Sequence, residues 1–256
     1  SHYFHPEGNA PASRVYETSK RWVKEGHEVT VITCVPSVPV GKPYEGYKNL
    51  MYQKENVEGV KVIRVWSFIS PKSGILYRTM NYISFMILSV LRSLFLGKFD
   101  VIIATSPQPF CGLAGALSSV LRRDPFILEV RDIWPESILA VNASSSGIVF
   151  RCMGWIERTM YKRASHIVTV GDGYKEQLLK KGLPYKKISI VMNGIDRDIF
   201  RSSHKTNNRL SDLGLGNRFV CSYVGTVGMA CGLEIVINAA KKLNEEKDEK
   251  FAYLIV

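Results

Sequence analysis

Charged and aromatic side chains follow directly after a short apolar segment near the middle of the chain. Phe126-Ile127-Leu128 has the character of a buried parallel strand, and it leads into Glu129, Arg131, Asp132 and Trp134. Ligands of open α/β sheets bind beside the carboxyl ends of such strands. We therefore expect these polar side chains to line a ligand-binding crevice.

Glycine-containing turns end several other apolar segments of the chain. Gly8 and Asn9 precede the first predicted helix, Gly171-Asp172 follows a predicted strand, and Gly225-Thr226-Val227-Gly228 follows another. Glycine lacks a Cβ, and a helix start offers unpaired N–H groups, so such turns can approach a phosphate group closely. The last turn is G-x-x-G and not G-x-G-x-x-G, which argues against a dinucleotide site. We interpret these turns as walls of one cleft, although each glycine could also serve only a turn.

Strands and helices alternate along the chain. Strands are predicted at Val29–Thr33, Val60–Trp66, Phe99–Thr105, Phe126–Leu128, His166–Val170, Lys187–Met192, Phe219–Val224 and Phe251–Val256. Helices are predicted from Pro11 to about Glu25, over Ile75–Leu96, after Pro109, and over Ile148–Ala164, Tyr174–Lys181 and Leu233–Glu245. Residues 36–58 have the composition of a surface loop. The pattern indicates an α/β fold with a mainly parallel sheet over residues 29–192 and helices on both of its faces.

Composition divides the chain into two parts. Residues 1–200 form the first predicted domain, the polar residues 201–218 a linker, and residues 219–256 the beginning of a second, similar domain. The chain opens on a loop and closes on a strand-like segment, so we expect an internal fragment of a longer protein that lacks the first strand of its first domain. Gly112 and Gly115 lie on a predicted helix and would allow it to pack closely on the sheet.

The charge of the chain favours anionic partners. The formal net charge is +11, and residues 1–200 hold 26 Lys and Arg against 17 Asp and Glu, a net +9. Phosphates, phospholipid headgroups and nucleic acid all fit this excess. The five cysteines form no C-x-x-C pair and indicate buried thiols of a reducing compartment.

Five sequence motifs occur in the order found in a known family. They are P-E-G-N-A-P-A-S-R (6–14), G-H-E-V-T-V-I-T (26–33), E-V-R-D-I-W-P-E (129–136), V-M-N-G-I-D-R-D-I-F (191–200) and Y-V-G-T-V-G-M-A-C-G-L-E (223–234). Together they resemble glycosyltransferase family 4, of GT-B fold, and especially its branch that builds bacterial surface polysaccharides, O-antigens and colanic acid. The resemblance covers essentially the whole chain. It implies two Rossmann-like domains, the first on the acceptor side and the second binding the nucleotide-sugar.

The resemblance also implies roles for the glycine turns. Gly8 and Asn9 match a loop that approaches the donor diphosphate, and Gly225, Thr226 and Gly228 match the phosphate loop of the second domain. Many family members carry an Arg and a Lys shortly after the first glycine of that second loop. This chain has Thr226 and then the uncharged segment Met229–Cys231 instead. The diphosphate charge must therefore be met by backbone amides, by the dipole of the following helix or by other basic residues.

Asp132 matches the acidic position that the family places near the reacting sugar carbon, where a carboxylate can stabilise developing positive charge. An ion pair with Arg131 or a helix N-cap before Pro135 would explain the same residue structurally. The resemblance and the strand-end positions further suggest six residues that line the acceptor side or the cleft. They are Glu7, Arg14, Arg131, Trp134, Gly171 and Asp172. Solvated surface remains an alternative for Glu7 and Arg14, and a place in the core for Trp134.

The resemblance implies a retaining glycosyltransferase. It would move a sugar from a nucleotide-sugar donor to a lipid-diphosphate-linked saccharide acceptor. The enzyme would be cytoplasmic and peripherally bound to the inner face of the plasma membrane. We expect no metal ion, no cofactor and no nucleic-acid partner, and we expect the fragment by itself to be inactive. A nucleotide-sugar epimerase of the same fold is the alternative enzyme, and a basic nucleic-acid-binding module is the alternative of another class.

The helix predicted at Ile75–Leu96 is the most apolar of the chain. Six basic residues lie on or beside the predicted helices at 75–96 and 148–164, the pattern of contact with an anionic membrane surface: Arg78, Arg92, Arg151, Arg158, Lys162 and Arg163. Ordinary core helices with a solvated basic face are the alternative.

Overall fold

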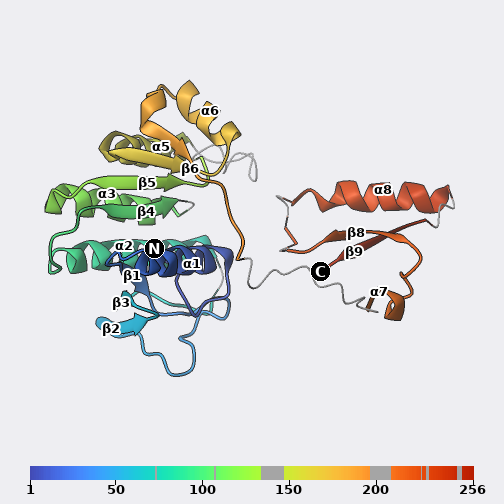
Figure 1. Cartoon of the computed structure of the whole chain (residues 1–256), viewed down its shortest axis with the longest axis horizontal. Helices are drawn as coiled ribbons and strands as arrows, with labels where there is room; N and C mark the ends of the chain where they lie inside the picture. Colours follow the sequence, from blue (N-terminus) through green and yellow to red (C-terminus); the bar gives the residue numbers. More distant parts are fainter. Residues whose placement is uncertain are drawn as a thin grey trace. The chain divides into compact units, whose positions relative to one another are not determined.

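A computed structural model of the chain describes residues 1–72, 74–106, 108–133, 147–196, 209–225, 227–228, 231–246 and 250–256. The described residues form two compact units. The first extends to Asn193 and the second begins at Gly194. Figure 1 labels helices and strands of both units.

A three-stranded sheet of order β1-β3-β2 lies in the first unit. β1 (Thr30–Cys34) and β3 (Val60–Val65) are parallel, and β2 (Tyr52–Val57) is antiparallel to β3. Glu58 and Gly59 form a two-residue turn with positive φ at both positions, the geometry of a tight β-hairpin. The prediction of a loop over residues 36–58 is therefore wrong for β2. Its sequence YQKENV is mostly polar and has no apolar alternation that could indicate a strand.

Helices cover both faces of this sheet. Val31 and Val62 pack in one cluster with Val15 of α1 (Ala10–Lys24). The neighbouring residues of the two strands, Ile32 and Ile63, belong to a second cluster, which contains Phe85, Leu88 and Leu96 from the region of α2 (Ile75–Ser93). Successive residues of a strand point to opposite faces, so α1 and α2 lie on opposite sides of the sheet.

A second sheet of the first unit has four parallel strands in chain order. They are β4 (Ile102–Ser106), β5 (Phe126–Val130), β6 (His166–Thr169) and β7 (Ile188–Ile190). The short 3-10 helix η1 (Tyr185–Lys187) lies immediately before β7. The connecting helices are α3 (Pro109–Arg122), α5 (Gly147–Arg163) and α6 (Asp172–Lys180). Figure 1 shows β4 and β5 side by side, with α3 and α5 in the same part of the unit.

The largest core cluster lies between this sheet and its helices. It contains Phe126, Leu128 and Ile167 from the strands and Met160 from α5, each at most 2% exposed. α3 comes very close to the strands: a Cβ added at Gly115 would lie 2.5 Å from Ala104 Cβ and 2.8 Å from Phe126 Cε2. The close packing predicted for this helix is thus confirmed.

The expectation of one sheet over residues 29–192 is wrong, because β1 and β4 belong to separate sheets. The strands are mainly parallel, as expected, and β2 is the antiparallel one. The start of the chain lies along the other edge of β1, where the Ser1 ammonium nitrogen donates to Ile32 O at 3.1 Å and Thr33 Oγ1 to His2 O at 2.9 Å. The described helices also leave the second face of the four-stranded sheet less buried than the first, with Ile103 41% exposed.

The second unit contains a β-loop-α-β arrangement, as predicted. β8 (Phe219–Tyr223) and β9 (Phe251–Ile255) are parallel, and α8 (Leu233–Glu245) connects them (Figure 1). The four-residue helix α7 (Arg209–Asp212) lies within residues 201–218, which were expected to form only a linker.

Candidate active site

The carboxyl ends of the parallel strands bring the predicted site residues of the first unit to one edge. β5 ends at Val130 and is followed immediately by Arg131 and Asp132. Arg14 joins α1 to the same edge: its Nη2 donates to Thr105 Oγ1 of β4 at 3.0 Å and lies 3.2 Å from Glu129 Oε2 of β5. The first helix and two strands of the sheet therefore meet at Arg14.

Arg131 extends this set of contacts to the end of the first unit. Its Nη1 lies 3.4 Å from Glu129 Oε1, and its Nη2 donates to Asn193 Oδ1 at 2.8 Å. Glu129 thus pairs with Arg14 through one carboxylate oxygen and with Arg131 through the other. Burial lowers the pKa of Arg14, while the negative charge of Glu129 raises it.

Asp132 lies partly exposed at the same edge. Burial raises the pKa of its carboxyl group above the ordinary value for aspartate. Ser106 Oγ donates to its backbone oxygen at 3.4 Å, which ties the turn after β5 to the end of β4. Within the described residues Arg131 forms its ion pair with Glu129, so the suggested ion pair between Asp132 and Arg131 is not formed. The alternative as an N-cap concerns residues 134–146, which lie outside the described residues, as does Trp134.

Glu7 is buried and has a clear structural contact. The backbone N–H groups of Ser37 and Val38 donate to its Oε1 at 2.9 and 3.1 Å, so it holds the loop that follows β1. Burial raises the pKa of Glu7, and these two hydrogen bonds act in the opposite direction. Its predicted place in the lining of the cleft stays a prediction.

The loop before α1 has the form expected of a helix start. Asn9 is the N-cap, and its Oδ1 accepts a hydrogen bond from Ala12 N at 2.9 Å. A Cβ added at Gly8 would meet no atom within 4 Å. The described part of the chain therefore gives no steric reason for glycine at this position, and it leaves space beside the loop.

Gly171 and Asp172 begin α6 directly after β6. Gly171 is the N-cap, with extended backbone, and Asp172 is exposed in the first turn. A carboxylate there stabilises the helix through its dipole. Both residues lie beyond the carboxyl end of β6, on the edge of the sheet that also carries Asp132.

The glycine turn of the second unit follows β8. Gly225 has φ of +159°, and its N–H donates to Val256 O at 3.0 Å. Gly228 O accepts from Cys231 N at 3.0 Å, before α8 begins without a side-chain cap. Thr226 lies outside the described residues. That Gly8, Asp132, Gly171 and Gly225 all face one cleft stays a prediction, because it concerns both units.

Two contact residues at this edge were not singled out from the sequence. They are Thr105 and Asn193. Glu129 was expected among the polar side chains at this strand end, and as a charged residue inside an apolar strand it needs a partner, which Arg14 and Arg131 provide. Nothing in the sequence shows that Asn193 lies beside Arg131.

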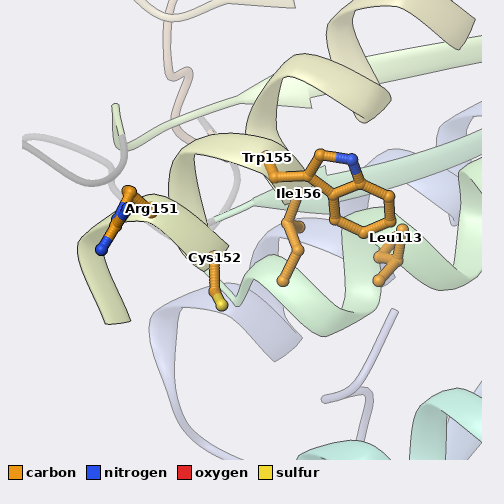
Figure 2. A pocket seen from close by; sticks show the side chains of 5 residues that line it. All are labelled: Leu113, Arg151, Cys152, Trp155 and Ile156. Carbon is orange, nitrogen blue, oxygen red and sulfur yellow. The ribbon is translucent and has the colours of Figure 1, made fainter. Parts of the chain in front are cut away.

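An open hollow lies between α3 and α5. It has a volume of 420 Å³, and Figure 2 shows the five side chains that line it: Leu113 from α3, and Arg151, Cys152, Trp155 and Ile156 from α5. Its lining is apolar apart from Arg151 and the thiol. In the described part of the chain, no group of three or more His, Cys, Asp or Glu residues is arranged to hold a metal ion. That the reaction needs no metal stays a prediction.

Comparison with known proteins decides the family. Residues 9–194 match the family described as the glycosyl transferase 4-like domain, which is most of the first unit and well over half of the chain. The chain belongs to this family. The family 4 resemblance predicted from the five motifs is confirmed.

Two curated relatives are similar to this glycosyl transferase 4-like chain. One is the Escherichia coli K12 protein WcaI, named for colanic acid biosynthesis as a glycosyl transferase, with 26% identity over 87% of this chain and 56% of that protein. The other is the α-maltose-1-phosphate synthase of Mycolicibacterium smegmatis, with 26% identity over 52% of this chain and 35% of that protein. The chain thus spans about half of the curated relatives' length, or less.

A solved structure shows the same fold. The Anabaena protein Alr3699/HepE, crystallised with UDP-glucose, superposes with a TM-score of 0.52 at 16% identity, over 71% of this chain and 44% of that chain. The α/β, Rossmann-like GT-B fold expected for the glycosyl transferase 4-like chain is confirmed.

Proposed function

We propose that the protein containing this chain is a retaining glycosyltransferase of bacterial surface-polysaccharide biosynthesis. It transfers a sugar from a nucleotide-sugar donor to a lipid-diphosphate-linked saccharide. The first unit contributes the acceptor side and Asp132, and the second unit contributes the nucleotide-binding side. Family membership over residues 9–194 supports the reaction class, and the name of WcaI supports the biosynthetic role.

The observation that carries this proposal is the position of Asp132 in a chain of this family. Its carboxyl group lies partly exposed at the carboxyl end of β5, without an ion pair to its neighbour Arg131. A carboxylate in that position can accept a hydrogen bond from a sugar hydroxyl and stabilise an oxocarbenium-like transition state. The UDP-glucose in the crystals of HepE supports a nucleotide-sugar as the donor class.

An exposed apolar face of α2 supports the proposed lipid-linked acceptor. The exposed apolar side chains of α2 recur at spacings of three or four residues, and we call them the apolar stripe: Leu76 (68% exposed), Met80, Ile83, Ile87 and Leu91. Such a stripe, on a helix that also carries the exposed Arg78, fits the interface of an anionic bilayer. In the described part of the chain, no helix has both the length and the hydropathy to cross a bilayer.

The basic residues predicted to face the membrane divide into two groups. Arg78, Arg151, Arg158 and Lys162 are exposed. Arg92 instead lies over the ring of Tyr52, and Arg163 donates to the backbone oxygen of Ser119 at 2.9 Å, so both contribute to the fold. We therefore propose that the four exposed basic residues attract the protein to the anionic lipids on the cytoplasmic face of the membrane.

A transfer assay with the full-length protein tests the function. Labelled nucleotide-sugars are incubated with a membrane lipid extract, and the label should appear in the lipid fraction with the donor's anomeric configuration. Conversion of the nucleotide-sugar itself without transfer would indicate the epimerase instead.

A further inference from the structure

We propose that Arg14 and Arg131, both paired with Glu129, form an anion clamp that binds the diphosphate group of a substrate. The inference deepens the proposed function and rests on it, since it assigns a role to residues at the same edge. A nucleotide-sugar and a lipid-linked acceptor both carry a diphosphate, so this chemistry is common to two possible ligands.

The charges at the clamp do not cancel. Two guanidinium groups share one carboxylate: Arg14 Nη2 lies 3.2 Å from Oε2 of Glu129, and Arg131 Nη1 lies 3.4 Å from Oε1. Among the described residues, these are the ion pairs of both arginines. Arg14, Arg131 and Glu129 together therefore carry a net charge of +1, at the end of the sheet where ligands of this fold class bind.

Neutral hydrogen bonds fix both arginines in place. Arg14 donates to Thr105 Oγ1, whose residue is only 8% exposed, and Arg131 donates to Asn193 Oδ1. Each guanidinium is thus held by two partners on different elements. A cation positioned in this way loses little conformational entropy when it binds an anion.

Both arginines keep N–H groups available for a ligand. A guanidinium carries five N–H donors, and only the Nη2 of Arg14 and the two Nη atoms of Arg131 are used in the contacts above. Each side chain is 19% exposed, and neither arginine has a buried nitrogen that lacks a partner. The remaining donors therefore reach solvent. Guanidinium forks suit phosphate oxygens because they bind them through parallel charge-assisted hydrogen bonds.

The sequence of the second unit explains why basic residues of the first unit would be needed to bind a diphosphate. The turn after β8 reads G-T-V-G-M-A-C over residues 225–231 and has no basic residue. Any side-chain cation for a diphosphate at this turn would come from elsewhere in the protein, in addition to backbone amides and the dipole of α8, and the clamp offers two such cations at a known place. Asp132 follows Arg131 directly, so a phosphate held by Arg131 would bring its attached sugar toward this carboxylate.

The test compares two diphosphate probes on the full-length protein. Titration calorimetry measures the Kd for uridine diphosphate, which represents the donor, and for farnesyl diphosphate, which represents a lipid-linked acceptor. Arg131→Gln and Arg14→Gln should each raise the Kd of one probe about 10- to 100-fold, since each removes charge-assisted hydrogen bonds. Arg131→Lys should restore only part of the affinity, because an ammonium group cannot form the fork.

Arg218→Gln is the matched control. Arg218 is exposed and precedes β8, at the end of the strand opposite Gly225, and its replacement removes the same charge. The Kd of both probes should stay unchanged in this variant. Circular dichroism of each variant shows whether it is folded.

The outcome also identifies the ligand. A selective loss of uridine diphosphate binding assigns the clamp to the donor, and a selective loss of farnesyl diphosphate binding assigns it to the acceptor. Folded clamp variants that bind both probes as the wild type does would overturn the clamp, while sugar transfer by the same protein would leave the proposed function intact. A wild-type protein that neither binds the probes nor transfers sugar would contradict both.

Discussion

Arg131 donates a 2.8 Å hydrogen bond to Asn193, the last residue of the first unit. The turn that carries Asp132 is therefore attached to the place where the chain leaves this unit. Together with the pairing of Arg131 to Glu129, this contact holds the end of β5 and the segment after β7 in one arrangement. Residues at the candidate site thus also stabilise the edge of the sheet.

Glu129→Gln should destabilise the first unit. The variant leaves Arg14, which is 19% exposed, without its counter-ion. Removing one partner of such a pair typically costs about 1–3 kcal/mol in the free energy of unfolding. Urea unfolding of the full-length protein measures the change. The exposed pair of Lys61 and Glu28 provides the control, because Glu28→Gln should have far less effect. Equal midpoints for the two variants would show that Glu129 has no structural role.

Gly8→Ala should weaken donor binding without loss of stability. A Cβ at Gly8 meets no atom of the described chain within 4 Å, so the variant should unfold at the same temperature as the wild type. If a diphosphate lies against this loop, the added methyl group occupies its space and the Kd for the nucleotide-sugar rises. Gly97→Ala is the control, since a Cβ there also meets nothing within 4 Å. An unchanged Kd would mean that Gly8 serves only the turn.

Binding to vesicles should depend on the apolar stripe and on charge. Co-sedimentation of the full-length protein should rise with anionic lipid content and fall with added salt, because each basic residue near the surface contributes about 1 kcal/mol. Leu76→Glu should reduce the bound fraction strongly, since this side chain is 68% exposed on α2. Met51→Glu, at a residue 66% exposed and outside the helices, is the control. Equal retention by neutral and anionic vesicles would contradict electrostatic docking.

The raised pKa of Asp132 predicts how stability depends on pH. Burial favours the neutral carboxyl group in the folded state, so the folded pKa exceeds the unfolded one. Between these two values the folded protein binds more protons, and the contribution of Asp132 to stability falls as pH rises. Asp132→Asn removes this dependence and should therefore be slightly more stable than the wild type at neutral pH. Denaturation curves at several pH values measure the difference, and a variant that is less stable at neutral pH would contradict the argument.

The sequence predicted the parallel β/α core well, because its strands are apolar and β-branched and end in clear glycine or polar turns. β5 and the close helix packing at Gly115 follow directly from such patterns. The polar strand β2 could not be predicted, because its stability comes from pairing with β3 and from the hairpin turn at Glu58 and Gly59. The separation of β1 from β4 depends on long-range pairing, which local patterns do not show.

Individual residues of the candidate site could be predicted from the sequence, but the contacts between them could not. Strand-end position indicated Asp132 and Arg131, and the first helix indicated Arg14. The sequence suggested that Arg131 pairs with Asp132, whereas the structure pairs it with Glu129. Neighbours in sequence along an extended segment point in different directions, so residues two apart on the same strand face share partners more easily than adjacent ones.

The rate of sugar transfer by Asp132→Asn tests the central claim most directly. In the full-length protein, asparagine keeps the size of the side chain but removes the negative charge that would stabilise the transition state. We predict that kcat for transfer to the lipid-linked acceptor falls about 10²- to 10³-fold, while the thermal midpoint does not decrease and nucleotide-sugar binding changes little. A variant that transfers sugar at the wild-type rate would contradict the account and leave Asp132 a structural residue of the turn after β5.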